Sequence, residues 1–489
     1  MNNPCNGGHR MSLPQRKVLQ SSDIQLTQTT PGMLDWFVVF ILAVIAFICF
    51  DQAWDMRVSM MHASDLIRCI FDGKFMHFYS YIMDNAAAGA YYSATAAYNI
   101  VIYITLGIWA LPLYLLNMAF GLDKYDYLLD GWGRILVIGL SVLCAYLITR
   151  LAGKFTKDST KAKWMGYFFL SSPIFIYCVI IQNQYDIFSV TLTLLALFFY
   201  FDKKYYKFSA LMSLAVCYKL FPLLVFFPLI LLTEKRLTKL IQYAAISVTP
   251  YIITTLLFSI FDPGYQATQK ELKSGYDFFG KVYAAQMAGG ASSFSIFIVL
   301  FILICVIAYY VKSKPNDFPA TAFTLCSASF ANFFIFVEWH PQWFIIIIPF
   351  LTLMVFSMKS FQLGVMLETA VSATYLLAAS LNFMTFYMMN NSLLVTMTWD
   401  HFFLSDNPNP IYNLFVSQGY SYVPVVSLFV GCLAALIFVA YKDLKSNEID
   451  INRFEYDIRI NRTMLYLRSL TILIYMLPPV VYYLSSPIG

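Results

Sequence analysis

The chain has 489 residues, of which 60% are hydrophobic, 18% aromatic and only 12% charged, and its mean hydropathy is +0.65. Soluble domains carry about 25% charged residues, so this composition excludes a water-soluble fold and predicts an integral membrane protein. The net charge of +5 is too small to indicate binding to nucleic acid.

Residues 1–33 are polar and carry Arg10, Arg16 and Lys17, which predicts a disordered cytoplasmic leader before a first span that is retained. From residue 34 on, apolar segments alternate with short polar connections and show no internal repeat. We expect residues 34–489 to form a single membrane domain. Most of the 9 cysteines lie within apolar runs without metal-ligand spacing, so we interpret them as buried hydrophobic residues.

Hydropathy predicts an all-α polytopic membrane protein with about 11–13 transmembrane or re-entrant helices. The predicted segments are 34–50, 97–120, 134–150, 164–181, 187–201, 207–232, 240–261, 293–312, 319–337, 342–357, 361–384, 422–441 and 463–484.

Basic residues set the expected orientation, because Lys and Arg collect in cytoplasmic loops. Five of them lie between residues 150 and 163, and more follow near 203–207, 235–239, 312–314 and 442–468. Placing these connections inside puts the long loops at about 51–96, 262–292 and 385–421 outside.

Two segments cannot be single crossings in this scheme. The run 207–232 begins and ends at basic connections, so we expect a re-entrant pair of short helices that breaks at Lys219. The stretch 97–150 needs an odd number of crossings but shows two apolar runs, and Pro112 is a candidate for a bend into a second hairpin.

The first outer loop has a helical pattern. Asp55, Ser59, His62, Asp65 and Asp72 share one side, and apolar residues such as Met56 and Met60 share the other. This pattern predicts an amphipathic helix that lies on the membrane surface and ends near Gly73. An ordinary solvated helix face is the alternative interpretation.

Polar residues also interrupt the apolar segments at three other places. Gln182-Asn183-Gln184-Tyr185-Asp186 is either a capped turn or a binding turn, and Glu338 to Trp343 is either an aromatic belt or part of a site. Lys219 at membrane depth costs about 2.5–3.5 kcal/mol, which favours a partner or a ligand for its charge.

These residues have the chemistry of a site for a lipid-linked phosphosugar. The lipid tail of such a substrate stays in the bilayer while a cation meets its phosphate and the sugar faces the outside. A carboxylate can then remove the proton of the acceptor hydroxyl as it attacks the anomeric carbon.

Short motifs resemble those of the GT-C superfamily of polytopic glycosyltransferases, especially the bacterial polyprenol-phosphate-mannose-dependent mannosyltransferases. Asp55-Met56-Arg57-Val58 is similar to the first-loop motif of that family, Gln184-Tyr185-Asp186 to its Gln-rich turn, and Lys219-Leu220-Phe221-Pro222 to its Lys-x-x-Pro break. Ala97-Tyr98-Asn99 departs from the usual Tyr-Pro-Pro at the second span, which leaves the identity of the sugar open.

The resemblance implies an inverting transfer, with mannose favoured, from a polyprenyl-phosphate sugar to a glycolipid or polysaccharide outside the cell. Asp55 would be the general base, with Asp51 and Asp65 as reserves. The other implied roles are phosphate binding by Lys219, Arg57 and His340, and sugar or acceptor binding by Gln184, Asp186 and Glu338. No cofactor is certain, but Mg²⁺ or Mn²⁺ is compatible with the carboxylates of the first loop.

The remaining expectations concern location and partners. We expect a monomer in the bacterial plasma membrane that contacts its lipids, binds no nucleic acid and has its active site on the extracytoplasmic side. A transporter or lipid flippase has the same hydropathy, but transporters usually show paired halves. A polymerase of surface polysaccharide would favour Arg-rich outer loops, whereas the first loop here holds five carboxylates and three cations.

Overall fold

In the computed structural model of the chain, the described residues are 29–50, 54–87, 96–275, 285–289, 292–382, 392, 410–445, 452–456 and 458–485. Most of the predicted leader and much of the predicted outer loops therefore lie outside them. The described elements are almost all helices, which confirms the all-α polytopic membrane fold.

Six described helices are long and apolar enough to cross a membrane. They are α4 (Ile100–Phe120), α5 (Tyr125–Ala152), α11 (Leu237–Phe261), α15 (Phe318–Phe336), α17 (Phe361–Asn382) and α21 (Val423–Lys445). A further pair, α6 (Ser159–Leu170) and the segment formed by α7 (Pro173–Phe175) and η2 (Ile176–Ile181), meets the same test with a bend of 43°.

Shorter helices complete the predicted apolar segments. They are α1 (Met33–Cys49), α8 (Ile187–Phe201), α9 (Tyr205–Tyr218), α10 (Leu223–Thr233), α14 (Ile296–Tyr310), η3 (Pro341–Ile346), α16 (Ile348–Phe356), α22 (Arg462–Leu470) and α23 (Leu473–Ser485). The connecting elements are α2 (Trp54–Phe71), η1 (Phe75–His77), α3 (Phe78–Ala87), α12 (Pro263–Gly275), α20 (Pro410–Ser417) and η4 (Arg453–Glu455).

One small sheet interrupts the helical pattern. Strands β1 (Gln286–Gly289) and β2 (Ser292–Ser295) pair antiparallel, with Gln286 opposite Ser295. The span predicted at 293–312 therefore starts too early. Its first residues belong to strand β2, and the apolar helix α14 begins only at Ile296.

The predicted break at Lys219 is confirmed. Lys219 follows α9 in an extended conformation (φ −154°, ψ 150°), and α10 starts four residues later. The hairpin proposed at Pro112 is wrong, because α4 continues through Pro112 to Phe120. Proline removes one backbone hydrogen bond but does not have to end a helix in a membrane.

Helices α4 and α5 form a hairpin, in which the rings of Trp109 and Trp132 stack at 4.8 Å and each indole N–H donates to the other residue's carbonyl. Tyr98, just before α4, lies at Lys219, and Asp130, early in α5, pairs with Arg57 in the first turns of α2. The start of α4 and the first turns of α5 therefore both lie at the end of the molecule that holds Lys219 and the start of α2.

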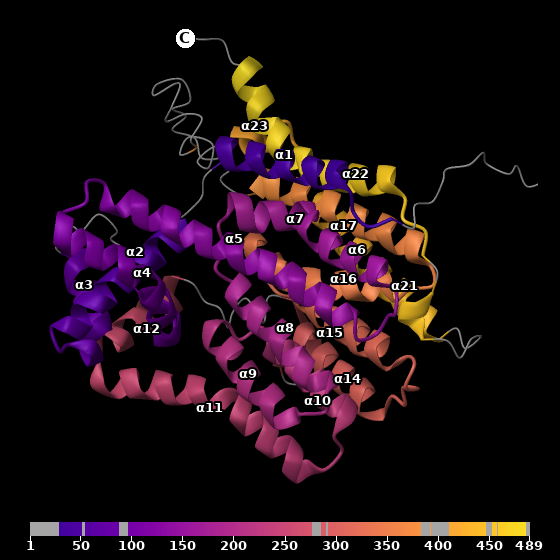
Figure 1. The fold of residues 1–489 in the computed structure, drawn as a ribbon, viewed down its shortest axis with the longest axis horizontal. Helices are drawn as coiled ribbons and strands as arrows, with labels where there is room; N and C mark the ends of the chain where they lie inside the picture. The colour runs from indigo at the N-terminus through magenta and orange to yellow at the C-terminus, as the bar shows by residue number, and fades with distance from the viewer. Residues whose placement is uncertain are drawn as a thin grey trace, which may run out of the picture.

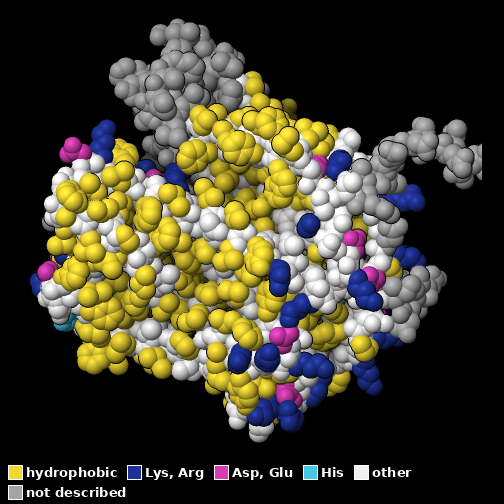
Figure 2. Space-filling model, viewed as in Figure 1, with side chains coloured by type: hydrophobic (Ala, Val, Ile, Leu, Met, Phe, Trp, Pro, Cys, Tyr) yellow, Lys and Arg dark blue, Asp and Glu magenta, His cyan; other side chains and the backbone are white. Residues whose placement is uncertain are grey.

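The basic connections meet at the opposite end. Lys154 pairs with Asp202, the Lys161 ammonium donates to the carbonyl of Phe454 (2.9 Å), and Arg453 pairs with Asp317 (2.7 Å). Most Lys and Arg side chains on the face in Figure 2 gather there, at the lower right. We call this the basic end, and the prediction that these connections share one side is confirmed.

Helices α2, α3, α4 and α12 form a side lobe next to the bundle, and α5 runs from it into the bundle (Figure 1). Asp262, which follows α11, accepts hydrogen bonds from the backbone of Tyr79 and Ser80 at the start of α3 (2.8 and 3.1 Å). The predicted helix after residue 54 is present as α2. It does not lie on an open membrane surface, because α3, α4 and α5 cover both its apolar and its polar side.

Gly166 allows α6 to pack closely against α5. A Cβ at this position would lie 2.3 Å from the Thr149 hydroxyl oxygen and 2.9 Å from the Ala145 carbonyl oxygen. We expect Gly166→Ala to lower the free energy of unfolding by about 1–3 kcal/mol, as overpacking does. Thermal unfolding in detergent measures this. Gly139→Ala on α5, where a Cβ meets nothing within 4 Å, is the control, and an equal loss in both variants would contradict the prediction.

Candidate active site

The turn 182–186 forms the floor of the candidate site, at the end of the bundle opposite the basic end. It joins η2, which has π-helical hydrogen bonding, to α8. Asn183 adopts a left-handed conformation (φ +47°), which non-glycine residues rarely do. Segments of π-helix and backbone strain both gather at functional sites, so the turn is a candidate on backbone geometry alone.

Asp55, at the start of α2, contacts this turn. The side-chain amide of Gln184 donates to Asp55 Oδ2 at 2.8 Å, across 129 positions of sequence. Gln184 is buried, whereas Asp55 is partly exposed. The structure therefore places the predicted base at the turn that the sequence predicted to bind the sugar.

Lys219 reaches the same turn from the break between α9 and α10. Its ammonium lies 3.3 Å from Asp186 Oδ1, and the Asp186 side chain is fully buried. Complete burial raises the pKa of Asp186, and the Lys219 charge opposes the rise. The predicted phosphate ligand thus has a buried counter-ion in the unliganded protein.

Three aromatic rings surround the Lys219 ammonium. Its nitrogen lies 4.9 Å from the ring centre of Tyr98, 5.1 Å from that of Tyr185 and 5.7 Å from that of Trp343. Cation–π attraction holds a desolvated ammonium by about 2 kcal/mol. The site residues predicted from the sequence include none of these three rings. Tyr185 and Trp343 nevertheless lie within the two polar turns that the sequence singled out, and that was the available signal.

The turn also carries buried polar atoms that lack hydrogen-bond partners among the described residues. They are Asn183 Nδ2, Gln184 Oε1, the Tyr185 hydroxyl and the carboxylate oxygens of Asp186, of which Oδ1 has only its ion pair with Lys219. Buried polar groups are nearly always hydrogen-bonded, and those that are not call for a ligand, an ion or water. Four such residues in succession indicate that this turn binds a polar molecule.

The segment 338–343 forms the other wall. The His340 ring packs on Trp343 with ring centres 5.1 Å apart, and Glu338 is exposed. The carbonyl of Pro341 accepts hydrogen bonds from Tyr375 and Cys178, which tie η3 to the bundle. His340 therefore contacts Trp343, which is one of the three rings around Lys219. Trp339 instead packs on Tyr375 and donates to the Phe334 carbonyl (2.8 Å), so it supports the fold.

The other predicted residues are not brought to Lys219. Arg57 pairs with Asp130 of α5 at 3.2 Å, and Arg134 also approaches that carboxylate, at 3.5 Å. Asp65 is buried in the side lobe, about 15 Å along α2 from Asp55 at 1.5 Å per residue. Asp51 lies outside the described residues. In the part of the chain that the structure describes, no three His, Cys, Asp or Glu side chains gather to hold a metal ion.

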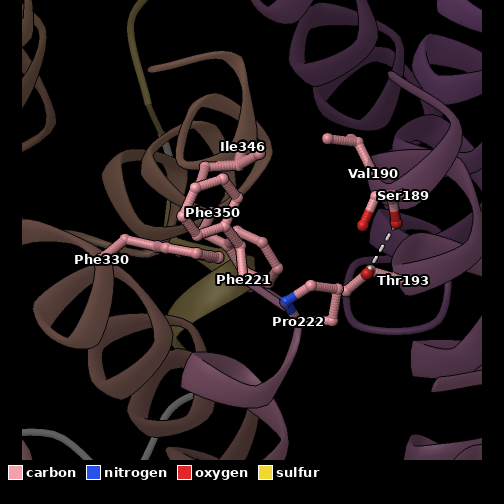
Figure 3. Close-up of a pocket in the computed structure, with 8 residues that line it drawn as sticks. All are labelled: Ser189, Val190, Thr193, Phe221, Pro222, Phe330, Ile346 and Phe350. Carbon is pink, nitrogen blue, oxygen red and sulfur yellow. Dashed lines mark hydrogen bonds between the residues drawn. The ribbon is translucent and has the colours of Figure 1, made fainter. Parts of the chain in front are cut away.

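An apolar cavity lies behind the break at Lys219 (Figure 3). Phe221, Pro222, Phe330 and Phe350 line it, and the hydroxyls of Ser189 and Thr193 donate to backbone carbonyls. It contains none of the predicted polar site residues, so we place the site on the turn and not in this cavity.

The model of glycosyltransferase family 87 matches residues 125–337, less than half of the chain. The matched stretch runs from the start of α5 to the end of α15 and includes Gln184, Asp186 and Lys219, but neither Asp55 nor His340. No curated protein matches the chain. The match supports a membrane glycosyltransferase and, with it, the GT-C resemblance.

Proposed function

We propose that the protein is an inverting glycosyltransferase that moves a sugar, mannose favoured, from a polyprenyl-phosphate donor to a glycolipid or polysaccharide acceptor on the extracytoplasmic side of a bacterial plasma membrane. The observation that carries this proposal is that one turn contacts both a partly exposed carboxylate, Asp55, and a cation surrounded by aromatic rings, Lys219. The site also lies at the end of the membrane helices opposite the basic end, which supports an outward-facing position.

The proposed reaction uses both charges. Asp55 takes the proton of the acceptor hydroxyl as its oxygen forms a bond to the anomeric carbon. The bond between that carbon and the phosphate oxygen breaks, and its electron pair leaves with the polyprenyl phosphate. Lys219 stabilises this developing charge, and an ammonium held in a desolvated place does so more strongly than one in water.

The other roles follow from position. His340 is next to Trp343 and is proposed to contact the phosphate or the sugar, and Asp186 to bind sugar hydroxyls once Lys219 turns to the phosphate. Arg57 keeps its proposed phosphate role only if it leaves Asp130. A divalent cation remains compatible with the exposed carboxylates of the first loop, and activity with and without EDTA tests it.

The test uses the full chain in detergent. Synthetic short-chain polyprenyl-phosphate mannose is offered with a mixed pool of membrane glycolipids, and products are identified by mass and anomeric configuration. Transfer with inversion supports the proposal. Transfer only from a nucleotide sugar would contradict the proposed donor. No transfer, together with lipid movement across reconstituted vesicles, would favour a flippase.

A further inference from the structure

The side chain of Gln184 has two polar ends with different surroundings. Its nitrogen contacts Asp55 Oδ2 at 2.8 Å. Because an ionised carboxylate can only accept hydrogen bonds, this contact identifies the NH₂ end of the amide. The other end, Oε1, is buried and has no partner among the described residues.

The backbone fixes the position of this amide. The Gln184 N–H donates to the Cys178 carbonyl (3.2 Å), and Asn183 directly before it is left-handed. A buried side chain on a turn held in this way has little freedom, so it presents its NH₂ group at a fixed point. Asp55 has more freedom, because it is partly exposed and lies in the first turn of α2.

We propose that Gln184 is a positioning residue for Asp55, which holds Oδ2 and turns Oδ1 toward the acceptor hydroxyl. No hydrogen bond from the described residues reaches Oδ1, so this oxygen is available to take the proton. The inference rests on the proposed function, and it moves Gln184 from sugar binding to alignment of the base.

The expected effect is on turnover more than on binding. Gln184→Met keeps the side-chain length but removes the donor, and it should lower kcat about 10–100-fold, because misplacing a reacting group by 1 Å costs about that much. The KM for the sugar donor should stay near that of the wild type. Gln184→Glu, which places a second carboxylate against the first, should lower kcat further.

A length exchange tests whether the contact itself matters. Asp55→Glu lengthens the base by one methylene and Gln184→Asn shortens its partner by one. Each change alone should lower kcat. The kcat of the double variant, relative to the wild type, should be about tenfold higher than the product of the two single relative values, as expected for coupled neighbours. A residue with a purely structural role would give no such recovery.

Asn332 on α15 is the matched control. It is also a buried amide, its Nδ2 donates to the Phe297 carbonyl at 3.0 Å, and its Oδ1 lacks a partner among the described residues. Asn332→Leu should disturb folding in detergent to a similar degree and leave kcat near that of the wild type. A normal kcat in Gln184→Met, or an equal loss in Asn332→Leu, would overturn the inference. If the wild type transfers, Asp55→Asn does not, and Gln184→Met keeps a normal kcat, the inference about Gln184 fails alone; a wild type without transfer would overturn the proposed function as well.

Discussion

Asp55→Asn is expected to lower kcat for sugar transfer by about 10³-fold, in the range that general bases contribute. Asparagine keeps the size of the side chain and can still contact Gln184, but it cannot take the proton of the acceptor hydroxyl. The KM for the sugar donor should change little, because Lys219 and the aromatic rings remain. Initial rates at saturating donor and acceptor measure the effect.

The control for this prediction is Asp72→Asn, which removes an exposed carboxylate just after α2 and outside the site. It should have the activity of the wild type. Undiminished transfer by a folded Asp55→Asn would remove Asp55 from the role of base and direct attention to His340, Asp65 and Asp51.

Lys219→Met is expected to abolish transfer and to destabilise the protein. It leaves Asp186 buried without its counter-ion, and breaking a buried pair in this way costs about 3–5 kcal/mol. The free energy of unfolding in detergent should fall accordingly, and donor binding should be lost with the phosphate ligand.

A second variant separates stability from function. Lys219→Met combined with Asp186→Asn removes both charges, so much of the stability should return, while transfer should stay absent because no cation meets the phosphate. Recovery of transfer in the double variant would mean that the phosphate is held elsewhere, with Arg57 as the first candidate.

The ends of the membrane segments could be predicted because polar residues mark them. The predicted segment 187–201 coincides with α8, and the charge of Lys219 placed the break between α9 and α10 correctly. The packing of α4 on α5 could not be predicted. It depends on the contact between Trp109 and Trp132, whose register is a property of the packed helices and not of either apolar run.

The sequence predicted which residues form the candidate site better than it predicted which residues they contact. Gln184, Asp186 and Lys219 were singled out as polar residues at interruptions of apolar segments, and Asp55 by the pattern and motif of the first loop. The structure joins these four residues. The partner of Arg57 was not predictable, because Asp130 is 73 positions away and faces it only through the packing of α5 on α2.

The surface of α4 has a consequence for where the reaction takes place. Ile104, Ile108 and Leu115 lie on one exposed side of this helix. A helix of this length and apolar composition settles in the bilayer so that lipid covers its exposed apolar side. Since α2 packs on α4, the depth of α4 sets the height of Asp55 above the hydrocarbon, and only hydroxyls held at that height on a membrane-bound acceptor would be within reach.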